Sequence, residues 1–170
     1  MKKNTRILSL MMLIFFTFLL AVTTGSYSVA AEESVAKKAP VYLSDLKPTS
    51  DSSPCITNKD AEGNPLQVPG VKFDKGLCVN TNSELVYTID GKYSELQVTI
   101  GHSSAYQEFK GKLIFTILGD GKVLFESKPM GSKENKEIKV NVKEVHKLVL
   151  RVNSDGVNSQ FVIWGEALLY

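Results

Sequence analysis

Few residues of this 170-residue chain offer catalytic or metal-binding chemistry. Its two histidines, His102 and His146, do not form a His-x-x-x-His pair, and the sequence has no Cys-x-x-Cys and no zinc-ligand spacing. It also lacks a Gly-x-Ser-x-Gly nucleophile motif. The Gly-Asp-Gly run at residues 119–121 is not followed by a predicted helix that would bind a phosphate at its N-terminus. The sequence therefore predicts no metal site and no phosphate loop.

Polar and aromatic side chains suited to ligand binding gather instead in two segments, residues 72–82 and residues 102–108. His102 follows a clean strand pattern and is the better ligand candidate of the two histidines. His146 lies in Lys-Glu-Val-His-Lys, which we interpret as a solvated connection between strands. Loops held by a rigid scaffold often carry binding residues, but ordinary exposed loops have a similar composition.

The elements that must position these segments are predicted to be strands. Apolar and polar residues alternate as in a strand with one buried face, and they do so at residues 84–89, 95–100, 137–142 and 147–152. Residues 112–118 are apolar on both faces, which is typical of a central strand. We therefore predict an all-β fold, a β-sandwich of about eight strands.

The connections carry further predictions. Asp120-Gly121 favours a tight hairpin turn. Residues 161–170 read as a closing strand broken near Gly165, with Trp164 in the core rather than on a sugar-binding surface. Residues 47–76 are rich in turn-forming residues and are interpreted as a long loop region.

Two cysteines, Cys55 and Cys78, stand near the ends of this loop region. In an exported protein we expect them to form a disulfide, which would stabilise the fold by roughly 3 kcal/mol in the loop-entropy model. The alternative is a pair of buried free thiols.

The N-terminus is typical of an export signal. Lys2, Lys3 and Arg6 precede an apolar run at residues 7–22, and small residues near Ala30 and Ala31 suit cleavage there. We predict a signal peptide at residues 1–31, a flexible tether at 32–40 and a folded domain at 41–170. An uncleaved membrane anchor is the alternative, although the apolar run is shorter than the ~18–20 residues that span a bilayer comfortably.

The mature protein is therefore expected to be secreted, either extracellular or associated with the cell envelope. Without the three basic residues of the signal, the formal net charge falls from +2 to −1. A nearly neutral chain gives no electrostatic reason to expect nucleic acid or an anionic membrane as a partner.

The whole predicted domain, residues 41–170, resembles the "novel putative carbohydrate-binding module" domain found beside family 98 glycoside hydrolases, which is related to family 51 carbohydrate-binding modules. The hairpin FTILGDGKVLFES is the most specific match. The matching stretches are residues 41–46, 73–80, 90–93, 98–101, 115–127 and 164–167. The resemblance implies a galactose-binding-like β-sandwich of the jelly-roll type, in agreement with the strand pattern.

The chain departs from the family pattern at positions that bear on function. It has Cys78, Asn80 and Thr81 where the family usually has Gly, His and Ala, and His102-Ser103 where the family tends to have acidic residues. Residues 160–163 replace an Asp-His-Ala-Asp run. Structural calcium is known in the family, but carboxylates suited to a hard cation are missing from these places. We therefore expect no metal or other cofactor.

The resemblance implies a non-catalytic protein that binds extracellular or cell-surface glycans, galactose-containing ones among them. The alternative is a secreted or envelope protein-interaction module that has lost the sugar site, and an enzyme is a distant third class. We predict Tyr106 as the platform that stacks on a sugar ring, with His102 and Asn80 as hydrogen-bond partners. The full predicted site comprises Lys72, Asn80, Asn82, His102, Tyr106 and Gln107.

Overall fold

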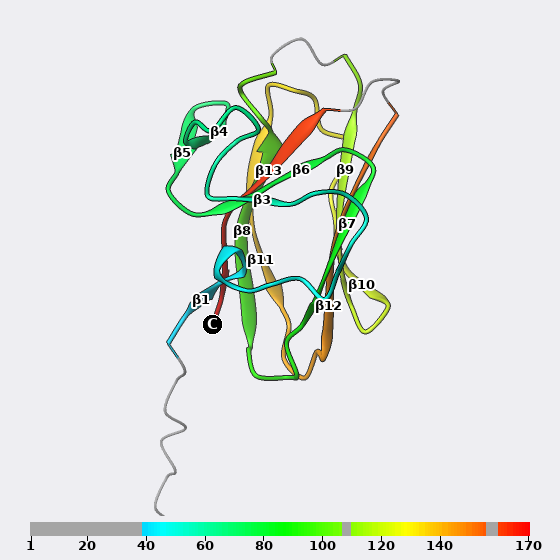
Figure 1. Cartoon of the computed structure of the whole chain (residues 1–170). Helices are drawn as coiled ribbons and strands as arrows, with labels where there is room; N and C mark the ends of the chain where they lie inside the picture. Colours follow the sequence, from blue (N-terminus) through cyan, green and yellow to red (C-terminus); the bar gives the residue numbers. More distant parts are fainter. Residues whose placement is uncertain (1–38, 107–109, 156–159) are drawn as a thin grey trace, which may run out of the picture. The chain divides into compact units, whose positions relative to one another are not determined.

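Antiparallel strands dominate the part of the chain that the structure describes (Figure 1). The structure is a computed structural model that describes residues 39–106, 110–155 and 160–170. Thirteen strands and one 3-10 turn, Leu43–Asp45, lie in these ranges. They contain no helix long and apolar enough to cross a membrane. The predicted signal peptide, residues 32–38 of the predicted tether and Gln107 lie outside them.

Two sheets and one ribbon make up the fold. The first sheet has six strands in the order β11-β8-β13-β6-β3, with β1 paired to β13. Its strands are β1 (Val41–Tyr42), β3 (Ile56–Thr57), β6 (Gly76–Asn80), β8 (Glu95–His102), β11 (Asn135–Asn141) and β13 (Phe161–Leu169). The second sheet has five strands in the order β10-β9-β12-β7-β2. Its strands are β2 (Ser50–Asp51), β7 (Ser83–Thr88), β9 (Leu113–Gly119), β10 (Lys122–Glu126) and β12 (Lys147–Ser154). The ribbon pairs β4 (Leu66–Val68) with β5 (Val71–Phe73).

The main core is built from residues of both sheets, as the alternating pattern predicts. Leu96, Val98 and Ile100 of β8 are fully buried in it, together with apolar residues of β7, β9 and β12. Trp164 is buried as well, and its ring packs edge-on against that of Phe115 with 5.1 Å between centroids. The predicted β-sandwich and the core position of Trp164 are both confirmed.

The β9–β10 hairpin has the predicted tight turn. Asp120 and Gly121 both have positive φ, 50° and 82°, as a type I′ turn requires. The Asp120 carboxylate accepts hydrogen bonds from the backbone N–H groups of Lys147 and His146, which lower the pKa of that carboxyl. The side chain of His146 is exposed. The backbone of this connection thus supports the turn, as expected for a structural segment.

The prediction that residues 47–76 form one long loop region is wrong, because this segment contains β2, β3, β4 and β5. Strands of two or three residues are too short for alternation to reveal them. The ribbon of β4 and β5 covers the outer face of the six-stranded sheet, where Leu66, Val68 and Phe73 form a second apolar cluster with Cys78 and Ile163.

Two glycines of the sheet allow this ribbon to approach. A Cβ on Gly165 would lie 2.6 Å from the Phe73 ring, and a Cβ on Gly101 would lie 2.9 Å from a methyl of Val68. The sequence suggested a break near Gly165, but strand β13 is continuous through this residue. It continues through a register shift between Gly165 and Leu168, with Glu166 at a φ of 46°. The irregular residues form a bulge that bends a single strand.

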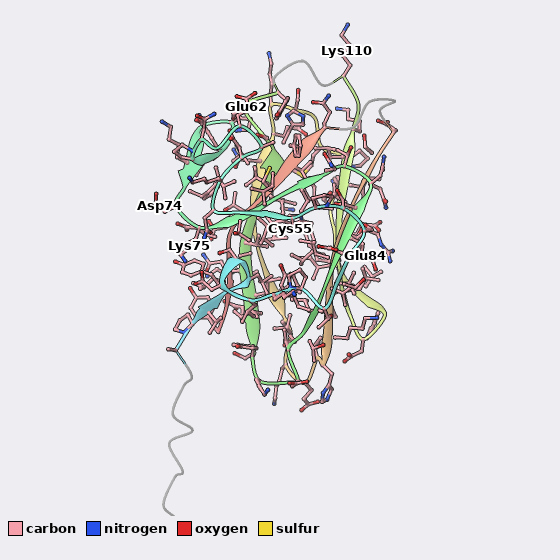
Figure 2. All side chains as sticks on the ribbon, in the orientation of Figure 1. Cys55, Glu62, Asp74, Lys75, Glu84 and Lys110 are labelled. Carbon is pink, nitrogen blue, oxygen red and sulfur yellow. The ribbon has the colours of Figure 1, made fainter. Side chains whose placement is uncertain are left out.

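The prediction of a disulfide is also wrong, because Cys55 and Cys78 are both free thiols. Cys78 pairs with Ile56 across β6 and β3, and both side chains pack beneath the ribbon. Cys55, one residue before Ile56 (Figure 2), packs instead against the core between the two sheets. Neighbouring residues of an extended chain point to opposite faces, so the sheet separates the two sulfur atoms.

Candidate functional site

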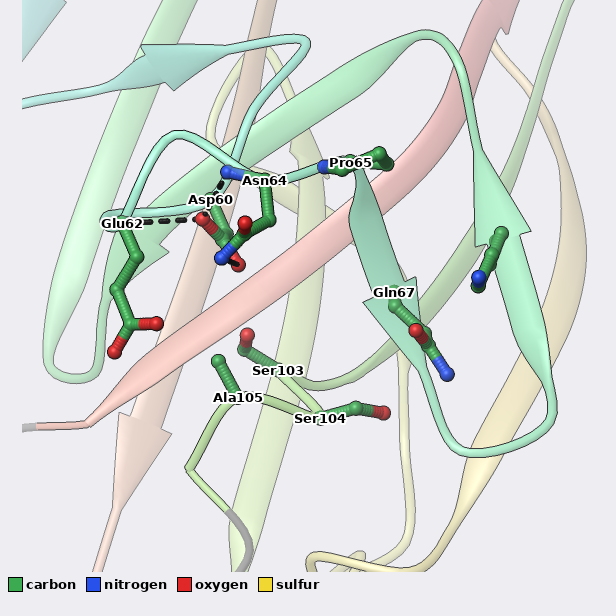
Figure 3. Close-up of a pocket in the computed structure, with 9 residues that line it drawn as sticks. Asp60, Glu62, Asn64, Pro65, Gln67, Ser103, Ser104 and Ala105 are labelled. Atoms are coloured by element: carbon green, nitrogen blue, oxygen red, sulfur yellow. Dashed lines mark hydrogen bonds between the residues drawn. The ribbon is translucent and has the colours of Figure 1, made fainter.

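A cavity of about 350 Å³ lies between the loop before β4 and the segment that follows β8 (Figure 3). Polar side chains and short loop residues line most of it. They are Asp60, Glu62, Asn64, Pro65, Gln67, Lys72, Ser103, Ser104 and Ala105. In Figure 3 the loop residues Asp60 and Asn64 face Ser103 and Ala105 across the opening. We call this space the ribbon cavity, because β4 and β5 supply Gln67 and Lys72.

Asp60 shapes one wall of the ribbon cavity. Its Oδ1 accepts hydrogen bonds from the backbone N–H groups of Glu62 and Asn64, at 2.9 and 2.8 Å, and its Oδ2 accepts a longer bond from Asn64 Nδ2. The backbone N–H of Asp60 also donates to the carbonyl of Asn64. With only 6% of its surface exposed, Asp60 holds the loop closed on itself. Its carboxylate is therefore engaged in the loop and is not the natural contact for a ligand.

The opposite wall is tied to the ribbon. The backbone N–H of Ser104 donates to the carbonyl of Gln67 at 2.8 Å, which fixes the segment after β8 against β4. On the far side of the ribbon, Asn135 Nδ2 donates to the carbonyl of Pro69 at 2.6 Å. Both walls are thus held in the absence of a ligand, which reduces the entropy that binding must overcome.

A second cavity of about 240 Å³ adjoins the first and shares Gln67, Ser103 and Ser104 with it. His102 lines this cavity but exposes only 1% of its surface. Burial lowers the pKa of His102, and hydrogen bonding to Gln160 and to the Ser103 backbone opposes that shift in part. His102 is therefore expected to be neutral at pH 7 and can contribute a hydrogen bond but no charge.

Of the predicted site residues, Lys72 and Tyr106 lie in or beside the ribbon cavity. Lys72 is an exposed residue of β5 that lines it. The ring of Tyr106 packs on that of Phe161, with 5.2 Å between centroids and 34° between planes. Partial desolvation, followed by the charges of Glu62 and Asp60, raises the pKa of Tyr106. Tyr106 directly follows Ala105, which lines the cavity.

Asn80 and Asn82 do not line the cavity. Asn80 ends β6, where its Nδ2 donates to the Ser53 hydroxyl at 3.1 Å and its Cα is paired with that of Phe161. Asn82 occupies a turn with a φ of 59°, and its Oδ1 accepts a hydrogen bond from the backbone N–H of Ser154. These contacts indicate that Asn82 stabilises the turn. Gln107 is not among the described residues.

The sequence reasoning missed the loop residues Asp60, Asn64 and Gln67. One signal was present, because Asp followed four residues later by Asn with Gly between them is typical of a loop closed by a side-chain acceptor. No local pattern indicates that this loop faces Ser103–Ala105, since the ribbon that brings them together is stabilised by tertiary packing.

The acidic side chains do not suit the calcium ion that the family resemblance implies. Within the described ranges, no three His, Cys, Asp or Glu side chains lie close enough together to hold a metal. Ca²⁺ takes about six to eight oxygen ligands, whereas the Asp60 carboxylate already accepts bonds from its own loop. Among the described residues, the acidic side chains therefore form no cluster of the kind that Ca²⁺ prefers.

The antiparallel sandwich defines the class, a galactose-binding-like β-sandwich of the kind found in carbohydrate-binding modules. The sequence profile of the NPCBM/NEW2 domain matches residues 39–170, and the chain belongs to this family. It is also 31% identical over 99 residues to a Renibacterium salmoninarum protein named "Putative endo-alpha-N-acetylgalactosaminidase". That match covers 58% of this chain but 6% of the relative's length, so this chain corresponds to a small part of that protein.

Solved structures of family 51 carbohydrate-binding modules have the same fold. The module of Clostridium perfringens GH95, in complex with methyl-galactose, has a TM-score of 0.70 and 26% identity, covering 77% of this chain and 99% of that one. A Clostridium perfringens ZmpB structure that contains the M60 catalytic domain and two such modules has a TM-score of 0.71 and 30% identity. It covers 76% of this chain and 15% of that one.

Proposed function

We propose that this chain is an exported, non-catalytic module that binds galactose-containing glycans in the ribbon cavity. The observation that carries the proposal is the lining of that cavity, where amide, ammonium and hydroxyl groups surround a preformed space of about 350 Å³. This volume is near the lower end of the ~300–1,000 Å³ typical of small-molecule pockets. A pocket of this size suits one or two sugar residues at the end of a glycan.

The polar groups of the cavity complement sugar hydroxyls, which both donate and accept hydrogen bonds. Asn64 and Gln67 carry amides with donors and acceptors in one plane, and Lys72 supplies further donors. Tyr106 and Phe161 supply apolar ring surface beside the acidic wall. Aromatic rings commonly accompany amides in carbohydrate sites because the C–H face of a sugar is apolar.

Three further arguments support the finer parts of this proposal. The similar module of Clostridium perfringens GH95 was solved with methyl-galactose, which favours galactose as the first sugar to test. Asp60 and Glu62 are the acidic residues of the cavity, and Asp60 is engaged in its own loop. Glycosidases need two carboxyl groups free to act on the bond, so the cavity favours binding over hydrolysis. Export is proposed from the basic and apolar N-terminus.

A glycan array probed with residues 39–170, followed by calorimetry on the best ligand, tests the proposal. Gln67→Ala should weaken binding about fivefold, the effect of losing one neutral hydrogen bond of about 1 kcal/mol, and Lys72→Ala should weaken it by about tenfold, because a hydrogen bond from a charged ammonium contributes about 1.5 kcal/mol or more. Gln97→Ala is the matched control, since Gln97 lies in β8 and donates to Glu137 instead of lining the cavity.

If the chain binds no glycan on the array, the proposed function is overturned. Unchanged affinity in both Gln67→Ala and Lys72→Ala would overturn the ribbon cavity as the site. Tyr106→Ala and Asn80→Ala extend the test to the residues that the sequence predicts, and Tyr106→Ala should have the larger effect because Tyr106 follows Ala105, a lining residue of the cavity.

A further inference from the structure

Three cavities adjoin one another at the end of the sandwich that carries the ribbon. The second cavity shares Gln67, Ser103 and Ser104 with the ribbon cavity, and it shares Ser132 and Lys133 with a third of about 270 Å³. The third cavity is lined by Lys110, Gly111, Lys112, Gly131, Ser132, Lys133 and Glu134. Figure 2 labels Glu62 and Lys110, from the two outer cavities, in the upper part of the molecule. The second cavity therefore borders both of the others, and a ligand longer than one sugar could contact more than one of them.

The charge of the lining changes sign across the three cavities. The ribbon cavity has two acidic residues, Asp60 and Glu62, and one lysine, Lys72. The third cavity has three lysines and one glutamate, so its lining is net positive. The histidine of the second cavity, His102, is buried with a lowered pKa and adds no positive charge between them at pH 7.

Acidic groups around the third cavity are partly committed to the backbone. Glu134 Oε2 accepts a hydrogen bond from the Gly131 N–H at 2.6 Å, and Asp155 Oδ1 accepts one from the Lys112 N–H at 2.6 Å. Among the described residues, neither Lys112 nor Lys133 takes part in an ion pair. Lys112 and Lys133 are both exposed to solvent at the rim of this cavity.

We propose that the third cavity binds an anionic substituent, a sulfate or carboxylate, on the glycan whose neutral sugar occupies the ribbon cavity. The proposal rests on the proposed function and adds a direction, with the anion at Lys112 and Lys133 and the uncharged sugar at Gln67. The acidic wall at Asp60 and Glu62 disfavours the opposite orientation, because like charges repel. The lysines are close to solvent, so their attraction is modest and screened by salt.

Lactose, 3′-sulfated lactose and 3′-sialylated lactose form a matched set of probes for calorimetry, because they share the neutral disaccharide. The acidic probes should bind about fivefold more tightly than lactose at low salt, and most of that preference should vanish at 0.5 M NaCl. The double variant Lys112→Gln/Lys133→Gln should lose the preference while keeping the affinity for lactose. Lys139→Gln, an exposed lysine of β11 that lines none of the three cavities, is the control.

The outcomes separate this inference from the function on which it rests. Equal binding of the three probes, or an unchanged preference in the double variant, overturns the anion site and leaves glycan binding intact. Competition by free sulfate as strong as that by sulfated lactose overturns the orientation, because the lactose part would then contribute nothing. Failure of all three probes, together with an empty array of neutral and acidic glycans, overturns the proposed function and the anion site with it.

Discussion

Asp60 is the residue on which the shape of the ribbon cavity depends most directly, because one carboxylate oxygen accepts from two backbone N–H groups. Asp60→Ala should lower the free energy of unfolding by about 1–3 kcal/mol, since two part-buried backbone N–H groups lose the charged acceptor that they share. It should also weaken glycan binding by reshaping the loop. Asp60→Asn keeps an acceptor at the same position and should lose less stability. Denaturant unfolding checks this ranking, and equal stability of wild type and Asp60→Ala would contradict it.

The free thiols lead to a second prediction at the residue scale. Burial raises the pKa of the Cys55 thiol to about 11 and that of the Cys78 thiol to about 12. Because the thiolate is the reactive form, both should react slowly with a thiol reagent at pH 8 in the folded protein. Both should react quickly in denaturant. A mass two hydrogens below that of the dithiol, measured without reduction, would instead demonstrate a disulfide.

The same shifts make stability depend on alkaline pH. The folded pKa values lie above the roughly 8.5 of an unfolded cysteine, so the unfolded chain releases these protons first as pH rises. The stabilising contribution is complete below about pH 8 and is lost progressively as pH rises toward 11 and 12. Unfolding midpoints at pH 7–10 should fall less steeply in Cys55→Ser/Cys78→Ser than in the wild type, and parallel declines would contradict this explanation.

At the scale of elements, the ribbon on the six-stranded sheet depends on the absence of side chains beneath it. Gly165→Ala would place a Cβ 2.6 Å from the Phe73 ring, so the ribbon must shift. Overpacking of this kind typically costs about 1–3 kcal/mol, and displacement of Gln67 and Lys72 should reduce glycan binding as well. Gly131→Ala is the control for stability, because its Cβ would meet nothing closer than 3.5 Å. Identical unfolding midpoints for the two variants would argue against close packing of the ribbon.

At the scale of the whole molecule, the last strand unites the first sheet. β13 lies between β8 and β6 and also pairs with β1. A chain that ends at residue 160 should therefore show no cooperative unfolding, because it loses the middle of the sheet together with Trp164. A chain of residues 39–170, the range that the family profile matches, should unfold cooperatively. Circular dichroism measures the unfolding, and a cooperative transition in the shortened chain would show that β13 is dispensable.

The sequence by itself determined the long strands, because the two-residue period of a half-buried strand is a local property of the chain. Leu96, Val98 and Ile100 became core residues as their alternation predicts, and Asp120-Gly121 formed the expected turn. The family resemblance extended this local reading to the galactose-binding-like sandwich.

Only the tertiary structure decided which face each short element covers and which loops meet. Residues 66–73 became a ribbon because an apolar patch on the sheet and two glycines offered a surface for packing, and neither is visible near those residues in the sequence. The same packing separated Cys55 from Cys78, which their spacing and the predicted export suggest as a pair. It also brought Asp60, Gln67 and Ser104 together, because contacts between distant segments depend on the stacking of whole elements and not on local pattern.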